Sequence, residues 1–312
     1  MVGLKKILSR LEGIKFTQGN LTKKVKGITF DSRKIENDYI FVAIKGHVFD
    51  GHNFINDAIS KGATVVIAEQ GFPISSDDIA QIIVGNSRKA LATAVKAFYK
   101  DIDETMRLIG VTGTNGKTTI TYLLKNLFET IGEEIGLIGT ICNMVGDIKL
   151  HSERTTPESL EIFRLFEDMH NANIKNVVME VSSHGLALER VHGLKFDIGI
   201  FTNLTPEHLD FHGNIEEYFK TKKMLFRMSD IGVINVDDKA GMRLFNEIDI
   251  GKISYGIKNS CDIQAKNLKL SPNGVSFTVA TSPNESEIFH LTTPGIFTVY
   301  NALASIATGH IL

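Results

Sequence analysis

A glycine-rich loop holds the residues best suited to chemistry. The segment GVTGTNGKTT occupies residues 110–119, with Val111 where the strict phosphate-loop pattern has its first glycine. The apolar run 108–111 leads into it, and apolar residues at helical spacing follow Lys117, which predicts a strand, a loop and a helix. Glycines let loop amides face phosphates, and the helix start adds favourable charge. We expect this loop to bind ATP with magnesium; a turn without a ligand is the alternative, which Gly-Lys-Thr-Thr disfavours.

Individual side chains in and near this loop suit the same chemistry. Lys117 would neutralise β- and γ-phosphate oxygens, and the Thr118 hydroxyl would ligate magnesium. Glu180 ends another apolar run, and an acid at the carboxyl end of a parallel strand is placed to bind the same metal. The alternative for Glu180 is a solvated or helix-capping carboxylate. The polar segment 201–212 follows a further strand, and its His212 is, from the residues alone, a structural or exposed histidine.

The bulk composition limits the class of protein. The chain has 312 residues, enough for two domains, and 43% hydrophobic with 22% charged residues indicates a globular protein. A net charge of −2 makes nucleic acid a poor candidate partner. Cys142 and Cys261 have no partners at metal-ligand spacing, so reduced buried thiols are expected rather than zinc or a disulfide. The first residues do not resemble a signal peptide and no apolar run has membrane length, so we expect a cytoplasmic protein.

The elements that must position these residues form two α/β domains. Residues 1–100 predict a small domain with strands at 28–30, 39–44 and 63–68 and helices near 54–58 and 87–100. Residues 101–312 predict a doubly wound, mostly parallel sheet, with strands at 108–111, 135–138, 177–180, 198–201 and 232–235. Beyond about residue 252, short alternating runs such as 275–279 predict a small antiparallel element. A helix from about Tyr300 follows.

Together these motifs resemble the Mur ligases of peptidoglycan synthesis. The segments that carry the resemblance in the second domain are 113–119, Glu-Val-Ser-Ser-His at 180–184, Asn-Leu-Thr at 203–205 and His-Leu-Asp at 208–210. In the first domain, residues 31–33, 41–43, 46–47, 50–52 and 62–63 resemble the UDP-binding domain of the branch that adds the third peptide residue. The resemblance therefore covers essentially the whole chain.

The resemblance implies an ATP-dependent amide ligase. Such an enzyme adds meso-diaminopimelate or L-lysine to UDP-N-acetylmuramoyl-L-alanyl-D-glutamate: the γ-phosphate passes to a substrate carboxylate, and the amine of the amino acid displaces phosphate from the acyl phosphate. The implied nucleotide residues are Gly113, Thr114, Asn115, Gly116, Lys117, Thr118, Thr119 and Asn301. The implied UDP residues are Ser32 and His47, and the implied muramoyl-dipeptide residues are Thr155, Thr156, Ser182 and Arg190. Arg154, Leu188 and Thr298 depart from the usual family residues.

The same resemblance implies two magnesium ions and a modified lysine. Thr118 and Glu180 would hold one ion, and Glu180 and His208 would help to hold the second. From spacing alone, Lys220, Lys222 and Lys223 form a solvated helix face. However, Lys222 begins the Lys-x-x-Leu-Phe pattern in which Mur ligases carry a lysine carbamylated by carbon dioxide. A carbamate supplies oxygens that magnesium prefers, and its formation needs a neutral amine. Lys117, Glu180, His208 and Lys222 would thus be the catalytic residues.

The resemblance also implies a third, C-terminal domain that closes over ATP and selects the amino acid. The sequence stops at Leu312, near the expected end of the central domain, so we expect that domain to be absent. One alternative is a module that binds nucleotide or UDP-sugar without completing ligation. Another is a different Mur ligase. A third is folylpolyglutamate synthase, against which the UDP-type first domain argues.

Overall fold

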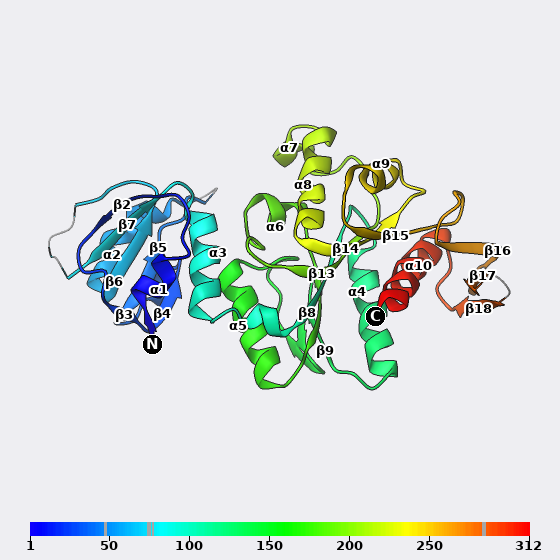
Figure 1. Cartoon of the computed structure of the whole chain (residues 1–312), viewed down its shortest axis with the longest axis horizontal. Helices are drawn as coiled ribbons and strands as arrows, with labels where there is room; N and C mark the ends of the chain where they lie inside the picture. The colour runs from blue at the N-terminus through cyan, green and yellow to red at the C-terminus, as the bar shows by residue number, and fades with distance from the viewer. Residues whose placement is uncertain (47–48, 74–75, 77, 283–284) are drawn as a thin grey trace. The chain divides into compact units, whose positions relative to one another are not determined.

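The chain folds into two compact units. The structure is a computed structural model that describes residues 1–46, 49–73, 76, 78–282 and 285–312 (Figure 1). Unit 1 comprises Met1–Asp103 together with Glu158–Glu167 and Leu188–Gly193. Unit 2 comprises Glu104–Pro157, Asp168–Ala187 and Leu194–Leu312. The sequence places the division near residue 100, and its charge pattern gives no indication that two later segments join unit 1.

Unit 1 is built on a five-stranded sheet. Its strand order is β2 (Ile14–Gln18), β7 (Ala80–Val84), β6 (Ala63–Ala68), β5 (Tyr39–Val42) and β4 (Gly27–Thr29). All neighbours are parallel except β2 and β7. The smaller elements are β1 (Val2–Gly3), α1 (Leu4–Leu8), β3 (Lys24–Val25), η1 (Ser32–Lys34), η2 (Gly51–Phe54), α2 (Ile55–Ser60), α3 (Ser87–Phe98) and, at its end, η3 (Ile102–Thr105). The predicted cap of α3 is present, because the Asn86 side chain accepts from two backbone amides of the first turn.

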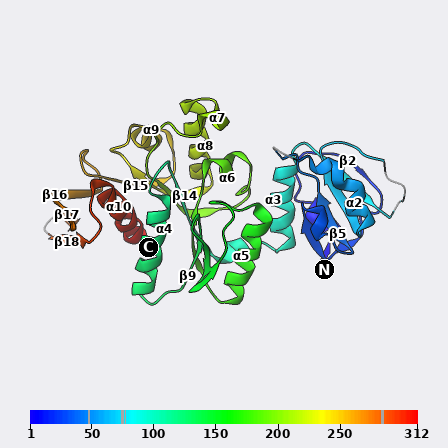
Figure 2. The ribbon, with the colours of Figure 1, turned by 180° about the vertical axis from the view of Figure 1, so that it is seen from behind.

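Unit 2 is built on an eleven-stranded sheet, seen from opposite sides in Figures 1 and 2. Its parallel strands, in spatial order, are β9 (Ile135–Ile138), β12 (Asn176–Glu180), β8 (Arg107–Thr112), β13 (Phe196–Phe201), β14 (Ser229–Asn235) and β15 (Gly251–Gly256). The hairpin β10 (Asn143–Val145) and β11 (Ile148–Leu150) extends the β9 edge. The other edge continues into β16 (Ile263–Ser271), β17 (Gly274–Ser282) and β18 (Glu285–Leu291). The predicted α/β class and mostly parallel sheet are confirmed.

Two predicted boundaries in unit 2 are wrong. The antiparallel element begins at β16 rather than near residue 252, because β15 still pairs in parallel with β14. The last helix, α10 (Ile296–Ile311), starts at Ile296 rather than near Tyr300. Gly295 precedes it with a φ of 101° and ends the extended chain.

The helices of unit 2 pack against the sheet, and residues of both form the hydrophobic core of this unit. They are α4 (Lys117–Thr130), α6 (Ser183–Ala187), α7 (Leu209–His212), α8 (Ile215–Arg227), α9 (Lys239–Glu247) and α10; α5 (Ser159–Asn171) is shared between the two units. Ile120, Leu124 and Phe128 of α4 are fully or almost fully buried in one cluster with Val111. These residues are the apolar face predicted from their spacing. Their packing with Val111 of β8 holds α4 against the sheet. Within the described residues, no helix is long and apolar enough to cross a membrane.

Candidate functional site

Three strand ends meet beside the glycine loop. In the sheet, β8 lies between β12 and β13, and all three strands run in parallel. Glu180 pairs with Val111, and Phe201 pairs with Thr112, so the residues that follow these strands share one edge. The chain order reverses about β8, and ligands of doubly wound sheets bind at such a point. A pocket here is lined by residues 114–119 with Thr140, Thr155 and Glu180.

The loop between β8 and α4 needs glycine at two positions. Gly113 has a φ of 142°, and a Cβ atom added there would lie 1.8 Å from Oγ1 of Thr202. Gly116 has a φ of 93°, and its added Cβ would lie 2.5 Å from Oδ1 of Asn301. At Gly113 both the backbone conformation and the close approach of Thr202 therefore oppose a larger residue, and at Gly116 the positive φ favours glycine. This contact also places Asn301, the predicted adenine-side residue, against the loop.

The side chain of Lys117 is hydrogen-bonded to the backbone of the glycine-rich loop. Its Nζ atom donates to the main-chain oxygens of Gly113 at 3.0 Å and Thr114 at 2.8 Å. Burial lowers the pKa of Lys117, while the charges of Glu180 and Glu207 partly oppose this shift. The two hydrogen bonds position the Lys117 side chain at the start of α4, where the first amides of the helix have no partners within the helix.

Glu180 is buried and fully engaged, which excludes the solvated carboxylate considered from the sequence. Only 1% of the residue is exposed. Thr118 Oγ1 donates to its two carboxylate oxygens at 3.0 Å each, and Thr140 donates from its amide at 2.8 Å and its hydroxyl at 3.1 Å. Thr118 and Glu180, both predicted metal ligands, are therefore brought together. They offer oxygen donors of the kind that magnesium prefers.

Lys222 differs from its two neighbours on α8. It is 1% exposed, its Nζ donates to the Gly113 oxygen at 2.8 Å, and it stands 4.5 Å from the ring centre of Tyr218. Burial, and secondly the charge of Lys117, hold the pKa of Lys222 well below its ordinary value. Lys220 and Lys223 instead pair with Glu217 and Glu247 at 2.8 and 2.7 Å. A solvated face is thus wrong for Lys222. Its spacing from the buried Tyr218 and Phe226 was the available signal.

The predicted histidine His208 lies in an aromatic cluster. It has a left-handed φ of 55°, and its ring lies 5.0 Å from that of His184. His212 packs 4.8 Å from the ring of Tyr218, and its pKa is lowered by burial and then by the charges of His184 and Lys222. Sequence reasoning gave His184 no role of its own. Among the described residues, no three His, Cys, Asp or Glu side chains form a group that could hold a metal.

Three of the predicted substrate residues lie beside Glu180. Thr155 Oγ1 accepts from the Thr140 hydroxyl at 3.0 Å. Thr156 Oγ1 lies 2.8 Å from the main-chain oxygen of Glu180 and 3.0 Å from Ser182 Oγ. The Ser182 amide in turn donates to Thr156 at 2.9 Å. Of these three residues, Thr155 lines the pocket beside the glycine loop, whereas Thr156 is fully buried.

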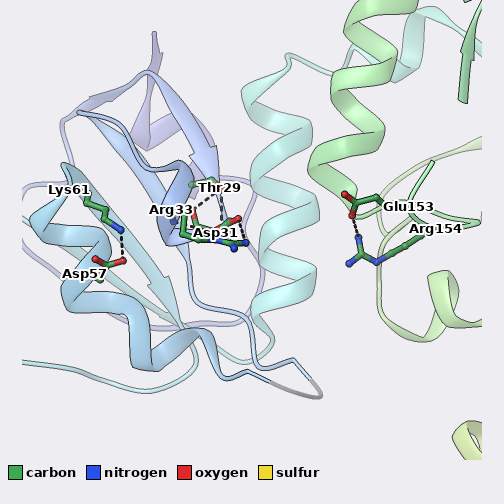
Figure 3. Close-up of polar contacts among 7 residues, drawn as sticks. All are labelled: Thr29, Asp31, Arg33, Asp57, Lys61, Glu153 and Arg154. Atoms are coloured by element: carbon green, nitrogen blue, oxygen red, sulfur yellow. Dashed lines mark hydrogen bonds and ion pairs between the residues drawn. The ribbon is translucent and has the colours of Figure 1, made fainter. Parts of the chain in front are cut away.

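The remaining predicted substrate residues belong to unit 1. Ser32 is buried at the start of η1, where Asp31 caps the turn and binds the Arg33 guanidinium through both oxygens at 2.9 Å. Figure 3 shows this pair and the Asp57–Lys61 ion pair of 2.8 Å. The pKa of Asp57 is lowered first by Lys61 and then by the Ser32 hydroxyl. His47 lies outside the described residues.

Two arginines singled out from the sequence are each paired with a carboxylate. Arg190 Nε lies 3.0 Å from Glu158, and Arg88 contacts the other oxygen of the same carboxylate at 3.2 Å. All three residues belong to unit 1. Arg154, which departs from the usual family residue, pairs with its neighbour Glu153 at 3.5 Å (Figure 3). Sequence reasoning gave Glu158 no role, although it directly follows the Thr-Thr-Pro segment at 155–157.

Comparisons with known proteins agree along the chain. A family model described as "Mur ligase middle domain" matches residues 111–309, and one described as "Mur ligase family, catalytic domain" matches residues 24–99. A UDP-N-acetylmuramoyl-L-alanyl-D-glutamate--2,6-diaminopimelate ligase of Clostridium tetani is 47% identical over 305 residues, 97% of this chain and 62% of that protein. Ligase 1 of that name from Clostridium acetobutylicum is 43% identical over 304 residues, covering 97% of this chain and 62% of that protein.

Solved structures show the same architecture. A structure of a ligase bearing the same name superposes with a TM-score of 0.86 at 25% identity, covering 99% of this chain and 63% of that one. The MurF ligase of Thermotoga maritima in complex with ADP superposes with a TM-score of 0.62 at 21% identity, covering 92% and 63%, and shows the shared fold alone. The chain thus spans about 62% of the length of the curated relatives that it matches.

Proposed function

Because the chain belongs to the Mur ligase family, we propose that it provides the ATP and UDP-substrate sites of a ligase that adds a third amino acid to UDP-N-acetylmuramoyl-L-alanyl-D-glutamate. The names of the clostridial relatives support diaminopimelate, rather than L-lysine, as that amino acid. Unit 1 would hold the UDP end of the substrate, and unit 2 would hold the nucleotide. A cytoplasmic location, as expected from the sequence, is part of the proposal.

The observation that carries the proposal is the convergence of Lys117, Thr118 and Glu180 at one sheet edge. Lys117 would move from the carbonyls that it now contacts to phosphate oxygens and neutralise their charge. The helix amides after Gly116 would orient the phosphates. Thr118 and Glu180 would hold magnesium, whose positive charge would offset the remaining phosphate charge. The γ-phosphate positioned in this way would pass to the substrate carboxylate. The catalytic contribution of this chain is therefore positioning and charge neutralisation.

Lys222 would contribute as a carbamate. Its buried amine has a lowered pKa, so a larger fraction is in the neutral form that attacks carbon dioxide. In this reaction the amine nitrogen bonds to carbon, one carbon–oxygen electron pair moves to oxygen, and an amine proton leaves. The product carries two oxygens in place of an ammonium group. With Glu180 and His208, these oxygens would hold the second magnesium ion.

The predicted substrate contacts are also part of the proposal. Ser32 and His47 would contact the uridine diphosphate. Thr155, Thr156, Ser182 and Arg190 would contact the muramoyl dipeptide. The three hydroxyl groups are supported by their joined hydrogen bonds beside Glu180. Asn301, whose side chain approaches Gly116, would contact the adenine side of ATP.

One assay tests this function against a binding module. The chain is incubated with ATP, magnesium and UDP-N-acetylmuramoyl dipeptide, with diaminopimelate, L-lysine or no amino acid, and ADP and amide product are measured. Amide product that requires diaminopimelate supports the ligase. Binding of both ligands without product, measured by calorimetry, supports the module. Failure to bind either ligand contradicts both.

A further inference from the structure

The side chain of Asn203 forms a reciprocal pair of hydrogen bonds with the backbone of Asn115 in the phosphate loop. The Asn115 amide donates to Asn203 Oδ1 at 3.0 Å, and Asn203 Nδ2 donates back to the Asn115 oxygen at 3.2 Å. The main-chain oxygen of Asn203 also accepts from the Thr114 amide at 2.8 Å. Asn203, the second residue after β13, therefore binds two consecutive residues of the loop, Thr114 and Asn115. Thr114 is buried, whereas Asn115 is exposed, so hydrogen bonds rather than burial hold Asn115.

The residues on either side of Asn203 strengthen the same contact. Thr202 Oγ1 donates to the Asn115 oxygen at 2.7 Å, and the Thr205 amide donates to Thr114 Oγ1 at 3.0 Å. The approach is so close that a Cβ atom on Gly113 would lie 1.8 Å from Thr202 Oγ1. Thr114 and Asn115 are thus held by hydrogen bonds to the segment 202–205.

This docking decides which amides face a ligand. The amides of Thr114 and Asn115 are occupied by Asn203, so they are not the groups that meet phosphate oxygens. The amides of residues 117–119 begin α4 and have no acceptor within the helix, since the first helical bond here runs from Ile120 to Gly116. The amides that remain for a ligand therefore include those of the helix start.

We propose that Asn203 is a positioning residue that holds the phosphate loop in its binding conformation before the nucleotide arrives. This inference rests on the proposed function, because the loop is taken to bind ATP. A flexible loop would have to be ordered on binding, which weakens affinity, whereas a loop already held in place avoids that cost. The same segment continues to Glu207 and His208, so the loop and the predicted metal-binding histidine are placed by one stretch of chain.

Substitution of Asn203 measures how much its hydrogen bonds to the loop contribute to nucleotide affinity. Asn203→Ala removes the side-chain bonds to Asn115, and we expect magnesium-ATP to bind about tenfold more weakly in calorimetry. Asn203→Asp keeps the acceptor for the Asn115 amide but turns a carboxylate toward the Asn115 carbonyl oxygen, so the loss should be larger. Asn126→Asp makes the same charge change at an exposed residue of α4, roughly 13 Å along the helix from its start at Lys117. This control should bind magnesium-ATP as tightly as wild type. Wild-type affinity in both Asn203 variants would overturn the inference.

Amide hydrogen exchange in the wild-type chain is a second test, which does not depend on whether the variants fold. In the nucleotide-free wild-type chain, the amides of Thr114 and Asn115 should already be protected, and magnesium-ATP should add protection mainly at residues 117–119. Protection of Thr114 and Asn115 that appears only with ATP would show that the loop is ordered by its ligand, and would sink the proposal. Should wild type bind no ATP at all, the proposed nucleotide site fails, while protection of these two amides still decides whether Asn203 holds the loop.

Discussion

Lys117 and Lys222 donate to the same atom, the main-chain oxygen of Gly113, at 3.0 and 2.8 Å. One lysine comes from the start of α4 and the other from the middle of α8. Two ammonium groups on one acceptor repel each other, and the charge of Lys117 is the second cause, after burial, of the lowered pKa of Lys222. The charge of Lys117 therefore favours the neutral form of Lys222, which is the form needed for carbamate formation.

Removal of Lys117 should strongly weaken nucleotide binding. In Lys117→Ala we expect the affinity for magnesium-ATP to fall about a hundredfold, because a charged hydrogen-bond donor to the phosphates is lost. Titration calorimetry measures this. Lys220→Ala, which removes an exposed lysine from α8, is the matched control and should leave the affinity unchanged. An unaltered affinity in Lys117→Ala would remove the phosphate-loop assignment.

Carbon dioxide should modify Lys222 and no other lysine of α8. Incubation with ¹³C-labelled bicarbonate should give one carbamate signal in the carbon NMR spectrum, and Lys222→Arg should lose it. Lys223→Arg should keep it, because Lys223 is paired with Glu247 on the outer side of the helix. A signal that persists in Lys222→Arg would reassign the modification.

The lowered pKa of Lys222 gives a signed pH dependence of stability. Between the folded-state pKa and the ordinary value of 10.5, the unfolded chain binds more protons at this lysine than the folded chain does. The free energy of unfolding should therefore rise with pH in this window. Lys222→Met lacks that contribution, so in buffers free of carbon dioxide wild type should gain stability relative to Lys222→Met from pH 7 to pH 9. Denaturant unfolding at both pH values checks the sign, and a constant difference would contradict it.

Gly113 should tolerate no side chain. Gly113→Ala combines a positive φ with a Cβ atom 1.8 Å from Thr202 Oγ1, and we expect a loss of about 3–5 kcal/mol in unfolding free energy, with loss of ATP binding. Gly132→Ala is the control: its φ is 81°, but nothing lies within 4 Å of the added atom. It should cost only about 1–2 kcal/mol, from backbone strain alone. Equal losses would show that the contact with Thr202 is unimportant.

Glu180 should link nucleotide binding to magnesium. Glu180→Gln keeps the shape of the side chain but lacks the carboxylate charge that a divalent cation requires. We expect that adding magnesium strengthens ATP binding in wild type and does so far less in the variant. Calorimetry with and without magnesium separates this effect from a general loss of the site, which would weaken binding in both conditions.

Much of this site could be predicted from the sequence because its geometry follows from topology. The ends of adjacent parallel strands share an edge, so the loop after β8 and the acid ending β12 were expected together. The burial of Lys222 was not expected from spacing, since three lysines in four residues are typical of a solvated helix face. Short elements were also missed: the hairpin β10–β11 has only three residues a strand, too few for a periodic pattern. The segments 158–167 and 188–193 join unit 1 through contacts distant in sequence, which no local pattern encodes.

The anchoring of Lys117 also has a consequence for the entropy of binding. A free lysine side chain loses up to about 2 kcal/mol of rotamer freedom when a ligand immobilises it. Here the ammonium group is already fixed by the carbonyl oxygens of Gly113 and Thr114. A phosphate that captures it would exchange one set of hydrogen bonds for another, and little additional ordering of the side chain would oppose the association.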